Sequence, residues 1–161
     1  AYTGKFVIPK DQTSASTKIN ADRSYTDQRA AATFVLYPKP FGILAEYNFG
    51  RGPEFNTATD SIEVKKLQGG FVTLSYMIKT KGDQIFIPFT RMQYYDGGKK
   101  HELDARSYNV HEYEIGVEWQ PIKQFELVVM YTMSSRRFED YTKQDNLQKG
   151  NLLRIQAQIN L

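Results

Sequence analysis

Within the segment Gly150–Leu161, apolar and polar residues alternate without interruption from Leu153 to Leu161. The apolar set is Leu153, Ile155, Ala157, Ile159 and Leu161. The polar set is Arg154, Gln156, Gln158 and Asn160. Because successive side chains of a strand point to opposite faces, this period of two predicts a β-strand with one apolar and one aqueous side. Any fold of this chain must give that strand two different environments.

Similar patterns along the chain predict about eight strands and an all-β, antiparallel fold. The expected strands are Tyr2–Ile8, Asp27–Tyr37, Phe41–Arg51, Ile62–Thr80, Gln84–Asp96, Tyr108–Gln120, Phe125–Arg137 and Lys149–Leu161. Most have about 11 to 13 residues, whereas strands of soluble proteins average about 5 to 6 and a tilted strand needs about 9 to 11 to cross a bilayer. The strand lengths favour a membrane-spanning sheet.

The expected connections alternate between short and long. The short ones contain Pro or Gly and predict tight turns at Tyr37–Phe41, Thr80–Gln84 and Gln120–Gln124. The long ones are polar and cover Pro9–Thr26, Gly52–Ser61, Gly97–Ser107 and Phe138–Gln148. Outer-membrane β-barrels have short periplasmic turns and longer outer loops. The alternation therefore predicts a transmembrane β-barrel segment, with aromatic residues at the strand ends near the lipid headgroups.

Composition agrees with this interpretation and excludes others. The mean hydropathy is low, at -0.55, and no run of about 20 apolar residues predicts a membrane-spanning helix. A barrel tolerates low hydropathy because only alternate residues meet lipid. The chain has no cysteine, which excludes disulfides and thiolate metal sites, and its net charge of +3 is mild. We expect one domain over residues 1–161, with any export signal outside the printed sequence.

Several phrases of this sequence resemble the phosphate-selective porin O and P family of outer-membrane channels. They are YTGKF (2–6), DQR (27–29), LYPKPFG (36–42), AEYNFGRGPE (45–54), PFTRMQYYDGGKK (88–100), EIGVEWQP (114–121) and GNLLRIQAQINL (150–161). The resemblance implies a bacterial outer-membrane porin that passes small solutes, with anions or phosphate preferred, and that needs no cofactor. It also implies a homotrimer in contact with the bilayer and lipopolysaccharide.

The resemblance further implies a barrel of about sixteen strands, which is about twice what this chain supplies. We therefore expect the chain to form the C-terminal half of such a barrel, with an N-terminal half that is missing here. The alternative is a small, closed, eight-stranded outer-membrane barrel with a structural or adhesive role. The two differ in function, because about eight strands enclose an interior filled by side chains whereas about sixteen leave an aqueous channel.

Strand parity predicts which side chains line the pore. The expected pore-lining, anion-binding bases are Lys5, Arg29, Lys65, Arg91, Arg136 and Arg154. The same parity turns five acids inward, namely Glu46, Glu112, Glu114, Glu118 and Glu126. Basic side chains along a pore lower the barrier for anions. The inward acids oppose that preference, so cross-strand ion pairs that only keep the wall hydrated are the competing interpretation.

Other classes of function lack support in the sequence. The loop cluster Lys99–His101, with Arg106 nearby, predicts either an anion funnel, contact with lipopolysaccharide phosphates or a solvated loop tip. His111 and Glu112 are adjacent on a strand and point to opposite faces, so no catalytic group converges and we expect no enzyme. Metal-ligand spacing and a nucleic-acid-binding pattern are also missing from the sequence. A soluble β-sandwich would bury the apolar faces against each other instead.

Overall fold

The computed structural model describes residues 1–8, 18–80, 82–99, 105–138 and 146–159, which form nine strands. They are β1 (Tyr2–Val7), β2 (Ser24–Leu36), β3 (Phe41–Asn56), β4 (Ser61–Tyr76), β5 (Ile78–Lys79), β6 (Ile85–Gly98), β7 (Ser107–Ile122), β8 (Phe125–Phe138) and β9 (Asn146–Ile159). The predicted all-β, antiparallel class is confirmed. Within these ranges, no helix combines the length and the apolar character that crossing a membrane requires.

The additional strand comes from a break in one predicted strand. The backbone N–H of Met77 donates to the carbonyl of Pro40 in the neighbouring turn, with an N···O distance of 2.6 Å. This bond takes Met77 out of the ladder, and β5 resumes pairing with β6 just beyond it. The predicted strand Ile62–Thr80 is therefore divided into β4 and β5.

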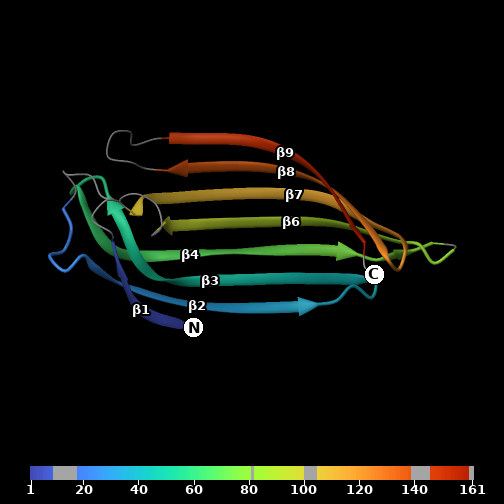
Figure 1. Ribbon diagram of the computed structural model, residues 1–161, viewed down its shortest axis with the longest axis horizontal. Coiled ribbons are helices and arrows are strands. Elements are labelled where there is room, and N and C mark those ends of the chain that lie inside the picture. Colours follow the sequence, from blue (N-terminus) through green and yellow to red (C-terminus); the bar gives the residue numbers. More distant parts are fainter. Residues whose placement is uncertain (9–17, 81, 100–104, 139–145, 160–161) are drawn as a thin grey trace.

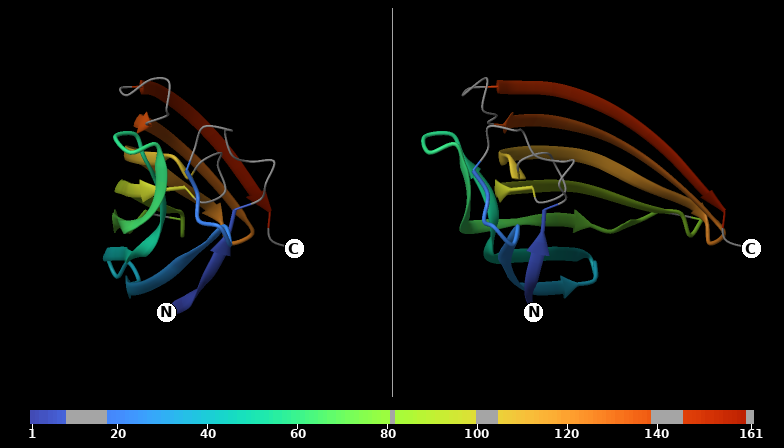
Figure 2. Two further views of the ribbon diagram at one scale, coloured as in Figure 1. Left: turned by 90° about the vertical axis from the view of Figure 1, so that its left-hand side faces the viewer. Right: turned by 60° about the vertical axis from the view of Figure 1, so that its left-hand side comes forward.

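All nine strands belong to one curved sheet. The order is β1-β2-β3-β4-β6-β7-β8-β9, so neighbours in the sheet follow one another in the chain apart from the short β5, which pairs only with β6. Figure 1 shows the long strands running side by side, and Figure 2 shows the sheet bent into an arc. The edge strands β1 and β9 are not paired with each other. The sheet is therefore an open segment and not a closed barrel.

The connections separate the sheet into two ends. The three predicted tight turns lie at one end, on the right in Figure 1, which we call the turn end. The opposite end is called the loop end. The predicted long loop Gly52–Ser61 is wrong, because β3 and β4 stay paired up to Asn56↔Ser61 and only four residues, Thr57–Asp60, form the turn. Gly52–Asn56 therefore continue β3, and Ser61 begins β4, instead of forming a polar loop.

Register sorts the side chains into two faces, because directly paired residues in an antiparallel sheet share a face. The pairs Glu112↔Ser134 and Thr132↔Leu152 lie on the concave face of the arc, whereas Val117↔Val129 and Val129↔Ile155 lie on the convex face. Convex apolar residues are open, with Ile155 65% exposed. No second layer covers them within the described part of the chain, so the compact apolar core of a soluble β-sandwich is not what this sequence forms.

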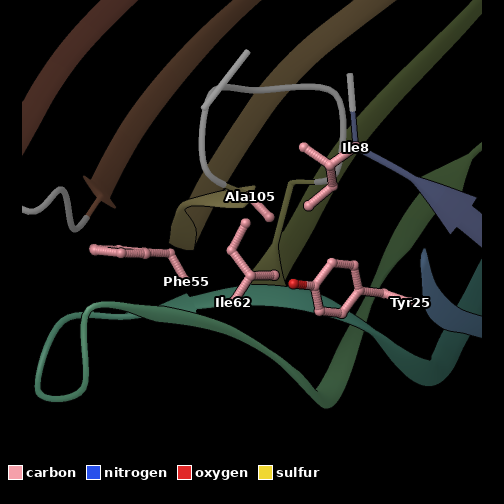
Figure 3. Close-up of a cluster of buried hydrophobic side chains, with 5 residues drawn as sticks. All are labelled: Ile8, Tyr25, Phe55, Ile62 and Ala105. Carbon is pink, nitrogen blue, oxygen red and sulfur yellow. The ribbon is translucent and has the colours of Figure 1, made fainter. Parts of the chain in front are cut away.

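The apolar core that exists is small and lies at the loop end. Its buried members are Ile8, Tyr25, Phe55, Ile62 and Ala105, shown in Figure 3. They come from the residue after β1, from β2, from the β3–β4 hairpin and from the segment before β7. The hairpin reaches the others because β4 pairs with β6 only over Gln68–Ser75, which lets its remaining residues bend away across the loop end (Figure 2). An isolated bridge from Lys18 to Ser61 holds the bent part.

Candidate pore wall

A row of carboxylates on β7 dominates the concave face. The three residues are Glu112, Glu114 and Glu118. They are separated by two and four positions, so all three side chains point to the same side of the strand. Ser134 donates a hydrogen bond of 2.8 Å to Glu112, and Gln93 donates another to the same carboxylate. These neighbours on β6 and β8 keep Glu112 in a polar environment. The concave face therefore carries hydrated charge, as a water-filled lumen requires.

Arg91 is the base that lies within this carboxylate row. Its guanidinium is 4.0 Å from the carboxylate of Glu114, which also accepts a 3.2 Å hydrogen bond from Thr132. The guanidinium of Arg91 also lies 4.2 Å from the ring centroid of Phe71. The positive charge is thus shared between a carboxylate and an aromatic face, which leaves less of it for a passing anion.

Two further predicted bases are paired with acids at the loop end. Arg29 donates to Asp27 over 3.0 Å, and Asp27 has no exposed surface. Lys65 is 3.5 Å from Glu54. These acids were not among the predicted wall residues. The parity that placed Arg29 on the wall also applies to Asp27, two residues earlier, so that signal was available in the sequence; Glu54 was assigned to a loop and was missed.

The last two predicted bases on this face lie near the open edge. Arg136 donates a 2.7 Å hydrogen bond to Gln148 and lies 5.5 Å from the ring centroid of Tyr108. Arg154 lies on β9 opposite Met130 and is exposed. Arg154 is thus the predicted base with the most open surroundings.

Lys5 lies on the wrong face for the predicted role. It pairs with Thr26, whereas Tyr2 pairs with Arg29, so β1 turns Tyr2, Gly4 and Phe6 to the concave side and Lys5 to the convex side. The physical reason is that Phe6 packs against the buried cluster at the loop end, and this sets the parity of the whole short strand. The prediction of Lys5 as a pore-lining residue alongside Arg29 is corrected accordingly.

All five acids that were expected to point inward lie on the concave face. Glu46 pairs with Thr33, Glu126 pairs with Gln158, and the three β7 glutamates follow the same parity. In the described strands the acids on this face are Asp27, Glu46, Glu54, Glu63, Glu112, Glu114, Glu118 and Glu126. The bases there are Arg29, Lys65, Lys79, Arg91, Arg136 and Arg154. The wall is therefore richer in acid than the sequence reading suggested.

The convex face has an apolar band with aromatic residues at both limits. Toward the loop end the band carries Tyr47, Tyr94, Tyr113 and Tyr131, and toward the turn end Phe41, Tyr76, Phe86 and Trp119. Phe86 and Trp119 stack with ring centroids 6.0 Å apart. This arrangement is typical of a lipid-facing barrel surface. Tyr95 is an exception to the expectation for aromatic residues, because its register places it on the concave face, where it donates to the carbonyl of Gly98.

The basic loop cluster is only partly described. Lys99 and Arg106 are joined by a backbone hydrogen bond of 3.0 Å, and the Lys99 ammonium lies 4.5 Å from the ring centroid of Tyr108. Lys100 and His101, the rest of the predicted cluster, lie outside the described residues. In the ranges that the structure does describe, no group of three or more His, Cys, Asp or Glu side chains is arranged to hold a metal ion.

Comparison with known families gives one result. Residues 9–161 match the family model described as "Phosphate-selective porin O and P". This match covers nearly the whole chain and contains every phrase that carries the resemblance except YTGKF at residues 2–6. No curated protein and no solved structure matched the chain.

Proposed function

Since the chain belongs to the phosphate-selective porin O and P family, we propose that its concave face lines a water-filled channel through which small solutes diffuse passively. Membership implies a porin of the bacterial outer membrane, a channel rather than an enzyme. The observation that carries the proposal is the division of one sheet into a charged concave face and an exposed apolar convex face. Such a sheet is stable when lipid covers one side and water fills the other.

The open edges support a larger barrel. β9 is a strand of 14 residues whose side chains are almost all exposed, and its outer edge pairs with nothing in the described sheet. Unpaired backbone groups cannot face hydrocarbon, so barrels that cross membranes are closed. We propose that further strands, contributed by an N-terminal half, join β1 and β9 and give about sixteen in all, which is wide enough for an aqueous pore.

The phosphate preference named by the family requires net positive charge on the wall. The described wall does not carry it, because most of its bases contact acids or aromatic rings and its acids are more numerous. We propose that these strands alone favour cations slightly, and that an anion preference of the closed channel depends on bases outside them. Arg154 and Arg136 are the contact points for anions that this part of the wall provides.

Association into homotrimers through the convex faces is part of the same proposal. The convex face is the surface that faces away from the lumen, and it is apolar along most strands. Native mass spectrometry of the protein extracted in mild detergent gives the number of copies. A monomer under conditions that preserve known porin trimers would overturn this part only.

Planar-bilayer recording tests the channel itself. The closed protein should give ohmic current steps, and its reversal potential in a salt gradient measures the preference for cations or anions. The E112Q/E114Q double variant should shift that preference toward anions, because it removes two negative charges from the wall. The matched control is D83N, which removes a charge in the turn before β6. Absence of current steps would contradict the proposal.

A further inference from the structure

The convex face carries basic side chains that the pore does not use. One row of directly paired residues crosses the first four strands: Thr3 on β1, Gln28 on β2, Arg51 on β3 and Lys66 on β4. Lys5 lies one pair beyond this row toward the loop end, on the same face. Arg51, Lys66 and Lys5 are all exposed. Within the described residues, none of these three bases forms an ion pair.

The row lies where the apolar band ends. On β3 the convex residues from the turn end are Phe41, Ile43, Ala45, Tyr47 and Phe49, and the next is Arg51. On β4 the corresponding residues are Tyr76, Leu74, Val72 and Gly70, followed by Gln68 and Lys66. Five alternate positions cover about 9 residues at roughly 3.3 Å each, which after tilting is near the roughly 25 Å height of a barrel's apolar band. The bases therefore lie at the level of lipid headgroups.

The surface beside the row is hollowed. A depression of about 650 Å³ is lined on the convex side by Thr3, Gln28, Ala30, Phe49, Arg51, Lys66, Gln68 and Asp96. Register places Gln28, Arg51 and Lys66 in the row toward the loop end. The next row toward the bilayer centre consists of Ala30, Phe49, Gln68 and Asp96, so its β2 and β3 positions are the apolar ones. Asp96 is the one carboxylate in this lining. A ligand with an anionic head and an apolar tail fits the part of the hollow over β2 and β3, where the bases and Gln28 are followed by Ala30 and Phe49.

We propose that Arg51 and Lys66, with Lys5 beside them, bind the phosphate of a phosphorylated glycolipid in the outer leaflet, whose acyl chain lies in the hollow over Ala30 and Phe49. Arg offers a planar fork of donors to phosphate and Lys a mobile point charge. The loop end faces the outer leaflet in barrels with short periplasmic turns. The site rests on the membrane orientation in the proposed function and adds a lipid partner to it.

The test compares two double variants of the full protein in detergent. R51Q/K66Q removes two charges from the row, and K39Q/K123Q removes two exposed lysines from tight turns at the opposite end. Native mass spectrometry with a bisphosphorylated, hexa-acylated disaccharide lipid, with its dephosphorylated form and with inorganic phosphate measures binding. We expect R51Q/K66Q to bind the phosphorylated lipid about tenfold more weakly, K39Q/K123Q to bind it as the parent does, and inorganic phosphate not to compete.

Three outcomes would overturn the site. They are binding by R51Q/K66Q that is no weaker than binding by K39Q/K123Q, equal binding of the dephosphorylated lipid, or displacement by inorganic phosphate at the lipid's own concentration. Conductance of the R51Q/K66Q variant distinguishes this failure from failure of the channel. Normal current steps with no change in lipid binding reject the lipid site alone, whereas absence of current in the parent protein rejects the proposed function.

Discussion

The loop end of β1–β4 and the β8–β9 ribbon are built from the same kind of alternating sequence, yet they are stabilised differently. At the loop end Phe55 is 1% exposed within a cluster contributed by four chain segments. On β9, Leu153 and Ile155 are 62% and 65% exposed, and the strand has one neighbour. The first region contains its own apolar environment, and the second depends on lipid and on a further strand. The following predictions test this difference.

The largest effect is expected in the buried cluster. Phe55→Ala should lower the free energy of unfolding by about 3–5 kcal/mol, because it leaves a cavity among side chains that cannot collapse freely. Phe49→Ala is the matched control on the same strand, where the ring is 50% exposed on the convex face. Urea unfolding of the protein in detergent, followed by tryptophan fluorescence, measures both. Equal losses would show that the cluster is no more of a core than the lipid-facing band.

The second prediction concerns the environment of β9. Ile155→Lys places a charge on the convex face near mid-height and should cost about 2–4 kcal/mol in a bilayer. Gln156→Lys, on the concave face of the same strand, should cost close to nothing because that side faces water. Folding titrations into phospholipid vesicles compare the two variants. If Gln156→Lys is the more damaging change, the assignment of the two faces is reversed.

The third prediction concerns the ion pair at the loop end. Asp27→Ala should destabilise the protein by about 2 kcal/mol, because Arg29 loses a charge-assisted hydrogen bond and the substitution removes buried side-chain atoms. Arg29 is itself partly exposed and can rehydrate, which keeps the cost below that of a fully buried pair. Thermal unfolding in detergent measures the change. Glu46→Ala, also on the wall but hydrogen-bonded to Thr33 and Asn48, should cost less.

The smallest effect is expected on the carboxylate row. Glu114→Gln should leave stability nearly unchanged, because the amide still accepts from Thr132, while the ratio of cation to anion permeability falls about twofold. Reversal potentials in a salt gradient measure the ratio. A change of the same size in Ile155→Ala, which alters only the convex face, would mean that the ratio does not report on the wall.

Much of the fold follows from local pattern. The segments Phe41–Arg51 and Phe125–Arg137 lie within strands of the structure. The turn expected at Gln120–Gln124 is shorter than predicted, because β7 continues through Pro121 to Ile122 and only Lys123 and Gln124 form the turn. The parity of β7 and β9 also sorts their faces correctly, because a period of two needs no knowledge of the partner strand. The resemblance to the porin family was confirmed over residues 9–161.

The errors share a cause, which is that they depend on distant packing. Lys5 was assigned to the wall because a six-residue strand carries little pattern, and the packing of Phe6 decided its parity. The polar character of Gly52–Ser61 predicts a loop, although the segment is paired up to Asn56↔Ser61 and supplies Phe55 to the core. Glu54 was missed as a wall residue for the same reason.

The sequence by itself determined that this chain forms long antiparallel strands with one apolar and one polar face, because alternation acts through the geometry of each strand alone. Only the tertiary structure decided which residues of β1 and of the β3–β4 hairpin meet at the loop end, that most of the wall's bases contact acids or aromatic rings, and that Lys5, Arg51 and Lys66 gather on the convex face. Those outcomes depend on the register between strands and on the bend of a hairpin, which join residues that the chain keeps far apart.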